Sequence, residues 1–109
     1  MKSAKGNKMI EDLLKSLESE VSLEEVVNQL KAVREIALEE KDPALVKILR
    51  LCYTYIEENG DFELGFLEEE GIEDMTDLEY LLQLILQSDK EANRKEIADM
   101  RDLLWDALY

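Results

Sequence analysis

The sequence contains no histidine and a single cysteine, and these absences bear first on catalysis. Histidine is the side chain most often used for general acid–base catalysis at neutral pH. No glycine pattern for phosphate binding and no nucleophile elbow is present either. A lone cysteine excludes an internal disulfide, and Cys52 stands in the apolar run "LVKILRLCYTYI", which predicts a buried, unreactive thiol. We therefore expect a protein that is not an enzyme and binds no cofactor.

Proline, glycine and aromatic residues are also scarce. The 109 residues include one proline and four glycines, and 6% of them are aromatic. So few turn formers favour helices over a sheet, while a hydrophobic content of 46% is too high for a disordered chain. No apolar run approaches the ~18 residues of a membrane span. We expect one cytoplasmic domain over residues 1–109 that has no membrane partner, with residues 1–7 as a flexible basic segment.

Apolar residues recur at helical spacing in five segments, at residues 8–19, 22–40, 43–59, 76–86 and 88–109. The third segment is apolar on nearly all sides, which predicts a central helix. The connection between the second and third segments is very short, so these two helices should lie antiparallel. The pattern predicts an all-α, single-domain bundle of about five helices, with helix three central and an acidic connection between helices three and four.

Start and stop signals support these segments. For the first helix, Asn7 is the expected cap. Capping boxes predict the starts of the second, fourth and fifth helices at Ser22, Thr76 and Ser88, in "SLEE", "TDLE" and "SDKE". The third helix has Asp42 as its cap and Pro43 at its first position, and Gly60 suits a left-handed residue at its end.

The charge is distributed unevenly along the chain. No lysine or arginine occurs between Arg50 and Lys90, and residues 51–89 hold twelve acids, which account for −12 of the net charge of −14. Such a block repels itself, nucleic acid and anionic membranes, and it attracts a basic protein surface, a polyamine or a metal ion. A solvated acidic loop that keeps the protein soluble explains the same charge without any partner.

Apolar residues are interleaved with these acids in "GDFELGFLEEEGIEDMTD", residues 60–77. Phe62, Leu64 and Phe66 alternate with polar residues as in an extended segment, and Phe62, Phe66 and Leu67 also fit one helical turn, so periodicity does not decide between the two. The favoured interpretation is that the aromatic side chains anchor the connection to the bundle. The alternative is that they stay partly exposed as a docking element for a basic, apolar groove.

The function that these features favour is a protein-interaction module, such as an adaptor, inhibitor or regulatory subunit. Its acidic surface around residues 57–79 would bind a basic partner, and one version is a nucleic-acid mimic whose carboxylates stand in for phosphates. The predicted partner-binding residues are Asp61, Phe62, Glu63, Phe66, Glu68, Glu69, Glu70, Glu73, Asp74 and Asp77. The alternative is a structural homo-oligomer that uses the apolar faces of helices three and four.

Two other features could form a cation site or a binding surface. Glu69, Glu73 and Asp77 would share one helix face and could hold a hard cation, but the glutamate–histidine pair of di-iron bundles and the twelfth-position glutamate of a calcium loop are both missing. We therefore expect no metal site. Trp105 and Tyr109 lie one turn apart, which suits either a binding surface or, as we prefer, ordinary packing of the last helix.

Overall fold

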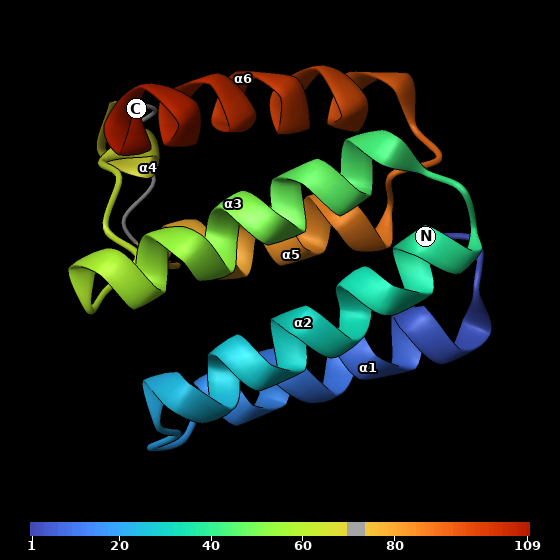
Figure 1. The fold of residues 1–109 in the computed structure, drawn as a ribbon, viewed down its shortest axis with the longest axis horizontal. Helices are drawn as coiled ribbons and strands as arrows, with labels where there is room; N and C mark the ends of the chain where they lie inside the picture. Colours follow the sequence, from blue (N-terminus) through green and yellow to red (C-terminus); the bar gives the residue numbers. More distant parts are fainter. Residues whose placement is uncertain (70–73) are drawn as a thin grey trace.

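Helices make up most of the described chain (Figure 1). A computed structural model describes residues 1–69 and 74–109, with backbone alone for residues 68 and 69. The helices are α1 (Ala4–Leu17), α2 (Leu23–Glu39), α3 (Pro43–Asn59), the single-turn α4 (Phe66–Glu69), α5 (Asp77–Leu86) and α6 (Glu91–Leu108). No strand occurs in these two ranges, so the predicted all-α class is confirmed. None of the described helices has both the length and the apolar character needed to cross a membrane.

The five longer helices close into a ring of contacts. α1 packs on α2, α2 on α3, α3 on α6, α6 on α5, and α5 again on α1. In Figure 1, α3 and α5 form a middle layer between α6 on one side and α1 with α2 on the other, which agrees with the predicted central place of the third helix. α2 and α3 run antiparallel, as their short connection predicted.

Aliphatic side chains fill the core, in keeping with the low aromatic content. The largest fully buried side chains come from all five longer helices, namely Ile10, Leu13, Leu30, Leu45, Ile48, Leu49, Leu81, Leu82, Ile85, Met100 and Leu104. Cys52 is buried among them as predicted, and this burial raises the pKa of its thiol far above the ordinary value. A thiol held in its protonated form is a poor nucleophile.

Most predicted helix ends agree with the structure. The Asp42 carboxylate accepts the amide of Leu45 at the start of α3, and Gly60 ends that helix with φ at 74°. Thr76 and Glu79 form the complete capping box at α5. Ser22 caps α2 through the amide of Glu25. These bonds join residues three positions apart, which is why the sequence revealed them.

Two predicted helix starts were wrong. α6 begins at Glu91 without a side-chain cap, because Ser88 is buried and its hydroxyl accepts a hydrogen bond from the Met1 amino group at 3.0 Å. α1 begins at Ala4, where Ser3 rather than Asn7 caps the helix by accepting the amide of Gly6. Ser88 thus bonds to a residue 87 positions away, whereas Asn7 lies inside α1 and donates to the carbonyl of Met1.

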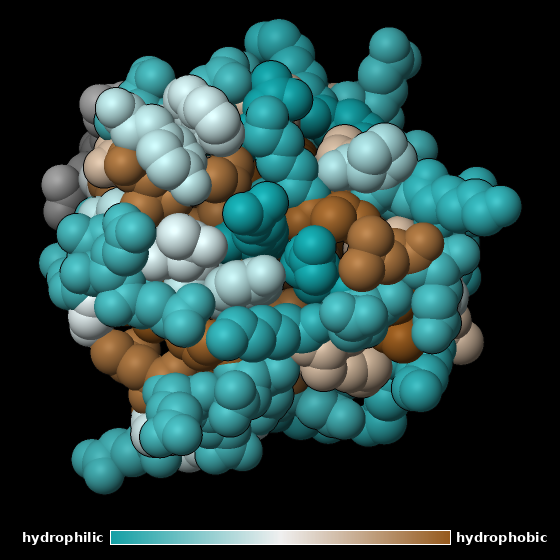
Figure 2. Space-filling view, viewed as in Figure 1, coloured by the Kyte–Doolittle hydropathy of each residue, from teal (hydrophilic) through white to brown (hydrophobic). Residues whose placement is uncertain are grey.

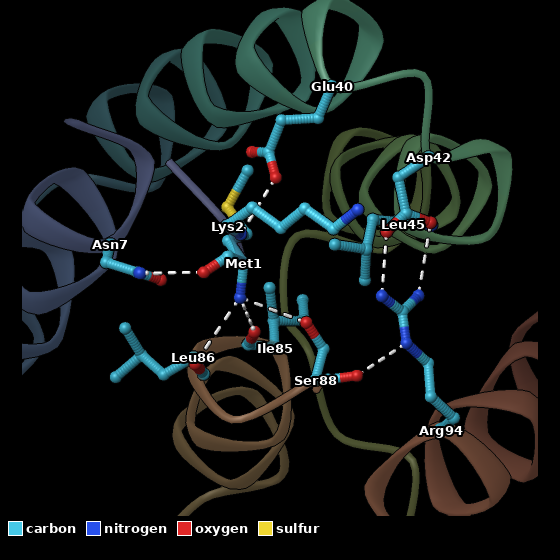
Figure 3. Close-up of polar contacts among 10 residues, drawn as sticks. All are labelled: Met1, Lys2, Asn7, Glu40, Asp42, Leu45, Ile85, Leu86, Ser88 and Arg94. Carbon is cyan, nitrogen blue, oxygen red and sulfur yellow. Dashed lines mark hydrogen bonds and ion pairs between the residues drawn. The ribbon is translucent and has the colours of Figure 1, made fainter. Parts of the chain in front are cut away.

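Residues 1–7 pack against the bundle, which differs from the expected flexible segment. The Met1 amino group donates to the Ile85 carbonyl at 2.8 Å, and the Asn7 side-chain amide donates to the Met1 carbonyl at 2.8 Å (Figure 3). The Lys2 amide donates to a Glu40 carboxylate oxygen at 2.8 Å. Burial lowers the pKa of the Met1 amino group, although the nearby Glu40 carboxylate raises it in part. The basic composition of residues 1–7 had suggested a free segment. Composition carries no information about hydrogen bonds such as these, so it could not predict them.

An ion pair ties two turns of the ring together (Figure 3). Arg94 donates to the two carboxylate oxygens of Asp42 at 3.1 and 2.7 Å, and its Nε donates to the Ser88 carbonyl at 2.6 Å. Asp42 lies in the α2–α3 turn and Ser88 in the α5–α6 turn. The Arg94 guanidinium lowers the pKa of the Asp42 carboxyl below its ordinary value. This pair therefore fixes where α6 closes against α3.

Leu49→Ala tests the position of the core. Leu49 on α3 is fully buried, so the substitution removes packed methyl groups and leaves a cavity. We expect the free energy of unfolding, measured by urea denaturation, to fall by about 2–5 kcal/mol. The matched control is Leu103→Ala on α6, where the side chain is exposed and the loss should be much smaller. Equal losses for the two variants would contradict the described core.

Asp42→Asn tests the ion pair through its pH dependence. Asparagine can still cap α3 but loses the charge that faces Arg94, so we expect unfolding at neutral pH to require about 1 kcal/mol less. Because the folded-state pKa of Asp42 is lowered, its contribution is complete above the ordinary carboxyl pKa and is lost as the pH falls through the folded-state value.

The difference between wild type and Asp42→Asn should accordingly shrink below about pH 4. Urea denaturation in buffers on both sides of that value measures it. A difference that stays constant with pH would show that the charge of Asp42 does not act through Arg94. Asp42→Ala removes the cap as well and should lose about 1 kcal/mol more than the asparagine variant at neutral pH.

Candidate functional site

The acidic connection, defined here as residues 60–76, joins the end of α3 to the start of α5. Its described residues lie at the left of Figure 1 and include the single turn of α4. Residues 61–65 are not helical, and α4 begins at Phe66, so the connection combines an irregular stretch with one helical turn. This mixture explains why neither the alternation of an extended segment nor the spacing of a helix alone described the sequence.

Aromatic side chains anchor the connection to the bundle, as the favoured interpretation predicted. The Phe62 ring meets the Tyr55 ring edge to face, with centroids 5.7 Å apart. The Phe66 ring lies 5.9 Å from the Tyr80 ring on α5. Both phenylalanines are half-buried against the core, while Leu67 is fully inside. Each ring therefore keeps an exposed part beside the acids as well as a packed part.

Asp77 fixes the same connection through hydrogen bonds to its backbone. Its carboxylate accepts three backbone amides, from Leu64 at 2.8 Å and from Gly65 and Leu67 at 3.1 Å. It is the first residue of α5, where the helix dipole also favours a negative charge. Only 9% of Asp77 is exposed. The sequence placed Asp77 among the partner-binding residues. Because its carboxylate bonds to backbone amides of the acidic connection, we assign it a structural role.

The other predicted residues fall into three groups. Asp61, Glu63 and Asp74 are exposed, and Phe62 and Phe66 are half-buried. Glu70, Glu73 and the side chains of Glu68 and Glu69 lie outside the described residues, as does the cation site imagined at Glu69 and Glu73. Among the residues that are described, no cluster of three or more metal-ligating side chains occurs.

An open groove of about 820 Å³, hereafter the acidic groove, brings part of the predicted partner-binding residues together. Asp61, Phe62 and Glu63 line it along with Asp77. Exposed Leu23 at the start of α2 and buried Leu67 and Leu78 supply apolar surface, with Gly60, Gly65, Met75 and Thr76 completing the lining. Phe66 and Asp74 are not part of this lining. The groove thus has an apolar floor and acidic side chains, without a basic residue.

Little of the acidic block is neutralised in the described structure. Eight of its twelve acids have described side chains, and among these Glu57 alone forms an ion pair, with Lys31 at 3.6 Å. Both partners are about half exposed, and such surface pairs contribute about 0–1 kcal/mol. Asp77 and Glu79 are bonded to backbone amides rather than to cations. Lysines and arginines from the two ends of the chain therefore leave most of these carboxylates unpaired.

A second groove was not predicted from the sequence. It lies between α2, α3 and the end of α6, and its cations are Arg34, Lys41, Lys47 and Arg50. Trp105 and Tyr109 line it too, and both are exposed, which differs from the preferred interpretation of ordinary packing. The aromatic pair was the one available signal in the sequence, because four cations spread over two helices and their turn do not form a linear cluster.

The comparisons with known proteins add no relative: no family model, curated protein or solved structure matches this chain.

Asp77→Asn tests the anchoring role. The variant places an amide group where the carboxylate now accepts three backbone N–H groups, so at least one donor loses its partner. We expect the free energy of unfolding to fall by about 2–3 kcal/mol in urea denaturation. Asp74→Asn is the matched control, because that side chain is exposed, and should change stability by less than about 0.5 kcal/mol. A neutral Asp77→Asn would rule out the anchor.

Proposed function

We propose that this protein is a non-enzymatic, cytoplasmic protein-interaction module that binds a basic partner through its acidic groove. An adaptor, an inhibitor or a regulatory subunit would each use such a surface. The observation that carries the proposal is the charge of the described block, in which one acid of eight is paired with a cation. Unpaired carboxylates held close together are stabilised when cations arrive, and this gives a basic surface a free-energy gain on binding.

The groove supplies the short-range part of recognition. Its floor includes the apolar side chains of Leu67 and Leu78, and the exposed edge of Phe62 lies beside Asp61 and Glu63. A partner segment with alternating basic and apolar residues would match this arrangement. The anchoring by Asp77 keeps the groove in shape before binding, so less conformational entropy is lost on association.

Attraction at long range supports the same proposal. Most of the net charge of −14 comes from residues 51–89, so a basic partner approaches a strongly polarised surface. Electrostatic steering of this kind raises association rates and is weakened by salt. In a specific version the protein is a nucleic-acid mimic, whose exposed Asp61, Glu63 and Asp74 take the place of phosphates. That version requires the partner to be a nucleic-acid-binding protein that the acidic groove competes for.

The burial of α3 and α5 supports this function over the homo-oligomer. That alternative uses the apolar faces of α3 and α5, the third and fourth of the longer helices. Many of their apolar side chains are buried in the protein's own core, including Leu51 on α3 and Leu84 on α5, although Val46 on α3 stays partly exposed.

A variant that neutralises three exposed acids in the acidic groove and beside it in sequence tests the proposal. The triple substitution Asp61→Asn, Glu63→Gln and Asp74→Asn removes three exposed carboxylates and retains side chains of the same size. The probe is a fluorescent peptide of alternating lysine and leucine, and its dissociation constant is measured by anisotropy at low and high salt. We expect the variant to bind at least about tenfold more weakly at low salt, and the difference to decrease as salt rises.

The control carries Glu11→Gln, Glu18→Gln and Asp99→Asn, which change the net charge equally at exposed positions on α1, its end and α6. This control should bind the lysine–leucine peptide within about threefold of wild type at matched salt. Equal weakening of both variants would mean that total charge, and not the acidic groove, attracts the peptide, and the proposal would be rejected.

A further inference from the structure

The groove formed by α2, α3 and the end of α6, hereafter the cationic groove, is a positively charged surface on an acidic protein. It has a volume of about 660 Å³ and is lined by Arg34, Leu38, Lys41, Asp42, Pro43, Val46, Lys47, Arg50, Leu51, Thr54, Trp105 and Tyr109. Asp42, the single acid in this lining, is bonded to Arg94. The groove shares no residue with the acidic groove. Figure 2 shows the face of α2, α3 and α6, where apolar patches are interrupted by strongly hydrophilic side chains.

Large apolar side chains are exposed around this groove. Leu38 is 43% exposed, Trp105 48% and Tyr109 75%. The two aromatic rings pack against each other with centroids 4.5 Å apart, and the Lys47 Nζ lies 4.9 Å from the centre of the Trp105 ring. Clustered aromatic surface beside cations is a feature of binding sites, because it combines apolar contact area with a polar contact.

The cations of this groove have few partners in the described structure. Lys41, Lys47 and Arg50 form no ion pair with any described residue, and Arg34 makes a long contact of 3.7 Å with the exposed Glu35. The Arg34 Nε is buried without a hydrogen-bond partner. Four positive charges thus surround an apolar surface.

We propose that this groove binds an acidic peptide segment that also carries apolar side chains. The apolar side chains would lie against Leu38, Val46 and Trp105. Carboxylates of the segment would meet Arg34, Lys47 and Arg50, where the arginine guanidinium groups suit bidentate contact with a carboxylate. The proposal is independent of the basic partner of the acidic groove, and it makes the chain a connector between two partners of opposite charge.

A peptide fits these observations better than a nucleic acid. The protein carries a net charge of −14, which repels a long polyanion, whereas a short segment with a few carboxylates feels mainly the cations within a Debye length of about 8 Å. Asp106 follows Trp105 directly on α6 and is exposed, so it adds to the repulsion of a long polyanion at that end of the groove.

A peptide also fits better than a second copy of this chain. The acidic, aromatic segment that a second copy would offer is fixed to its own bundle by the Phe62–Tyr55 contact and by the three hydrogen bonds of Asp77. It would have to leave those contacts before it could enter the groove of a neighbour.

Tryptophan fluorescence gives a direct test, because Trp105 is the single tryptophan and lines the groove. The probe is a synthetic peptide of about twelve residues in which glutamates alternate with leucine and phenylalanine. We expect its addition to shift the Trp105 emission to shorter wavelength, with saturation below ~1 mM. A peptide with serine at every apolar position should bind at least about tenfold more weakly.

Two charge-reversal variants locate the site. Lys47→Glu with Arg50→Glu should weaken the glutamate–leucine peptide at least about tenfold, measured by anisotropy of a labelled peptide so that changes near Trp105 do not interfere. Lys5→Glu with Lys15→Glu alters the net charge equally on α1, outside the groove, and should bind within about threefold of wild type. Circular dichroism and thermal melting establish that both variants are folded.

Any of four outcomes would overturn the proposal. The first is no emission shift at ~1 mM peptide, and the second is equal weakening by the two charge reversals. The third is tighter binding of a thymidine oligonucleotide than of the peptide. Concentration-dependent self-association that Lys47→Glu with Arg50→Glu abolishes would assign the groove to a second copy instead. None of these results depends on whether the acidic groove binds a basic partner.

Discussion

The ion pair between Asp42 and Arg94 holds the ring of helices closed. Asp42 caps α3 and accepts two hydrogen bonds from Arg94, which also donates to the Ser88 carbonyl. One guanidinium thereby joins the α2–α3 turn to the α5–α6 turn and places α6 against α3. That placement brings Trp105 to the cations of α2 and α3. Asp42 of this pair also lines the cationic groove, while the aliphatic core supplies most of the stability.

Charge segregation is the second organising feature. The acids of residues 51–89 could have been neutralised by lysines from elsewhere in the chain, but among their described side chains Glu57 alone gains such a partner. Within the acidic connection, Phe62 and Phe66 pack against the bundle while the described acids Asp61, Glu63 and Asp74 stay exposed, so the connection is fixed without pairing those charges. Four of the thirteen cations line the groove between α2, α3 and the end of α6 instead. The two oppositely charged grooves are the features on which the two proposed interactions rest.

Sequence reasoning succeeded where the cause is local and was wrong where a side chain has a distant partner. The caps at Ser22, Asp42 and Thr76 agree with the structure because each bond spans three residues. Ser88 carries the same pattern, yet its hydroxyl accepts from Met1. In the sequence Asp77 is indistinguishable from the other acids of its block, although its carboxylate accepts backbone amides ten to thirteen residues away. Of the candidate site, the anchoring by Phe62 and Phe66 was predicted, and the cationic groove was not.

The sequence by itself determined the helical class, the approximate helix limits, the buried Cys52 and the concentration of acids between Arg50 and Lys90, because periodicity, capping and composition act over a few residues. The tertiary structure alone decided that Asp77 supports the acidic connection from inside and that Arg34, Lys47 and Arg50 share a groove with Trp105. Those groupings arise from packing between helices far apart in the chain, and no local pattern of residues encodes which helix faces which.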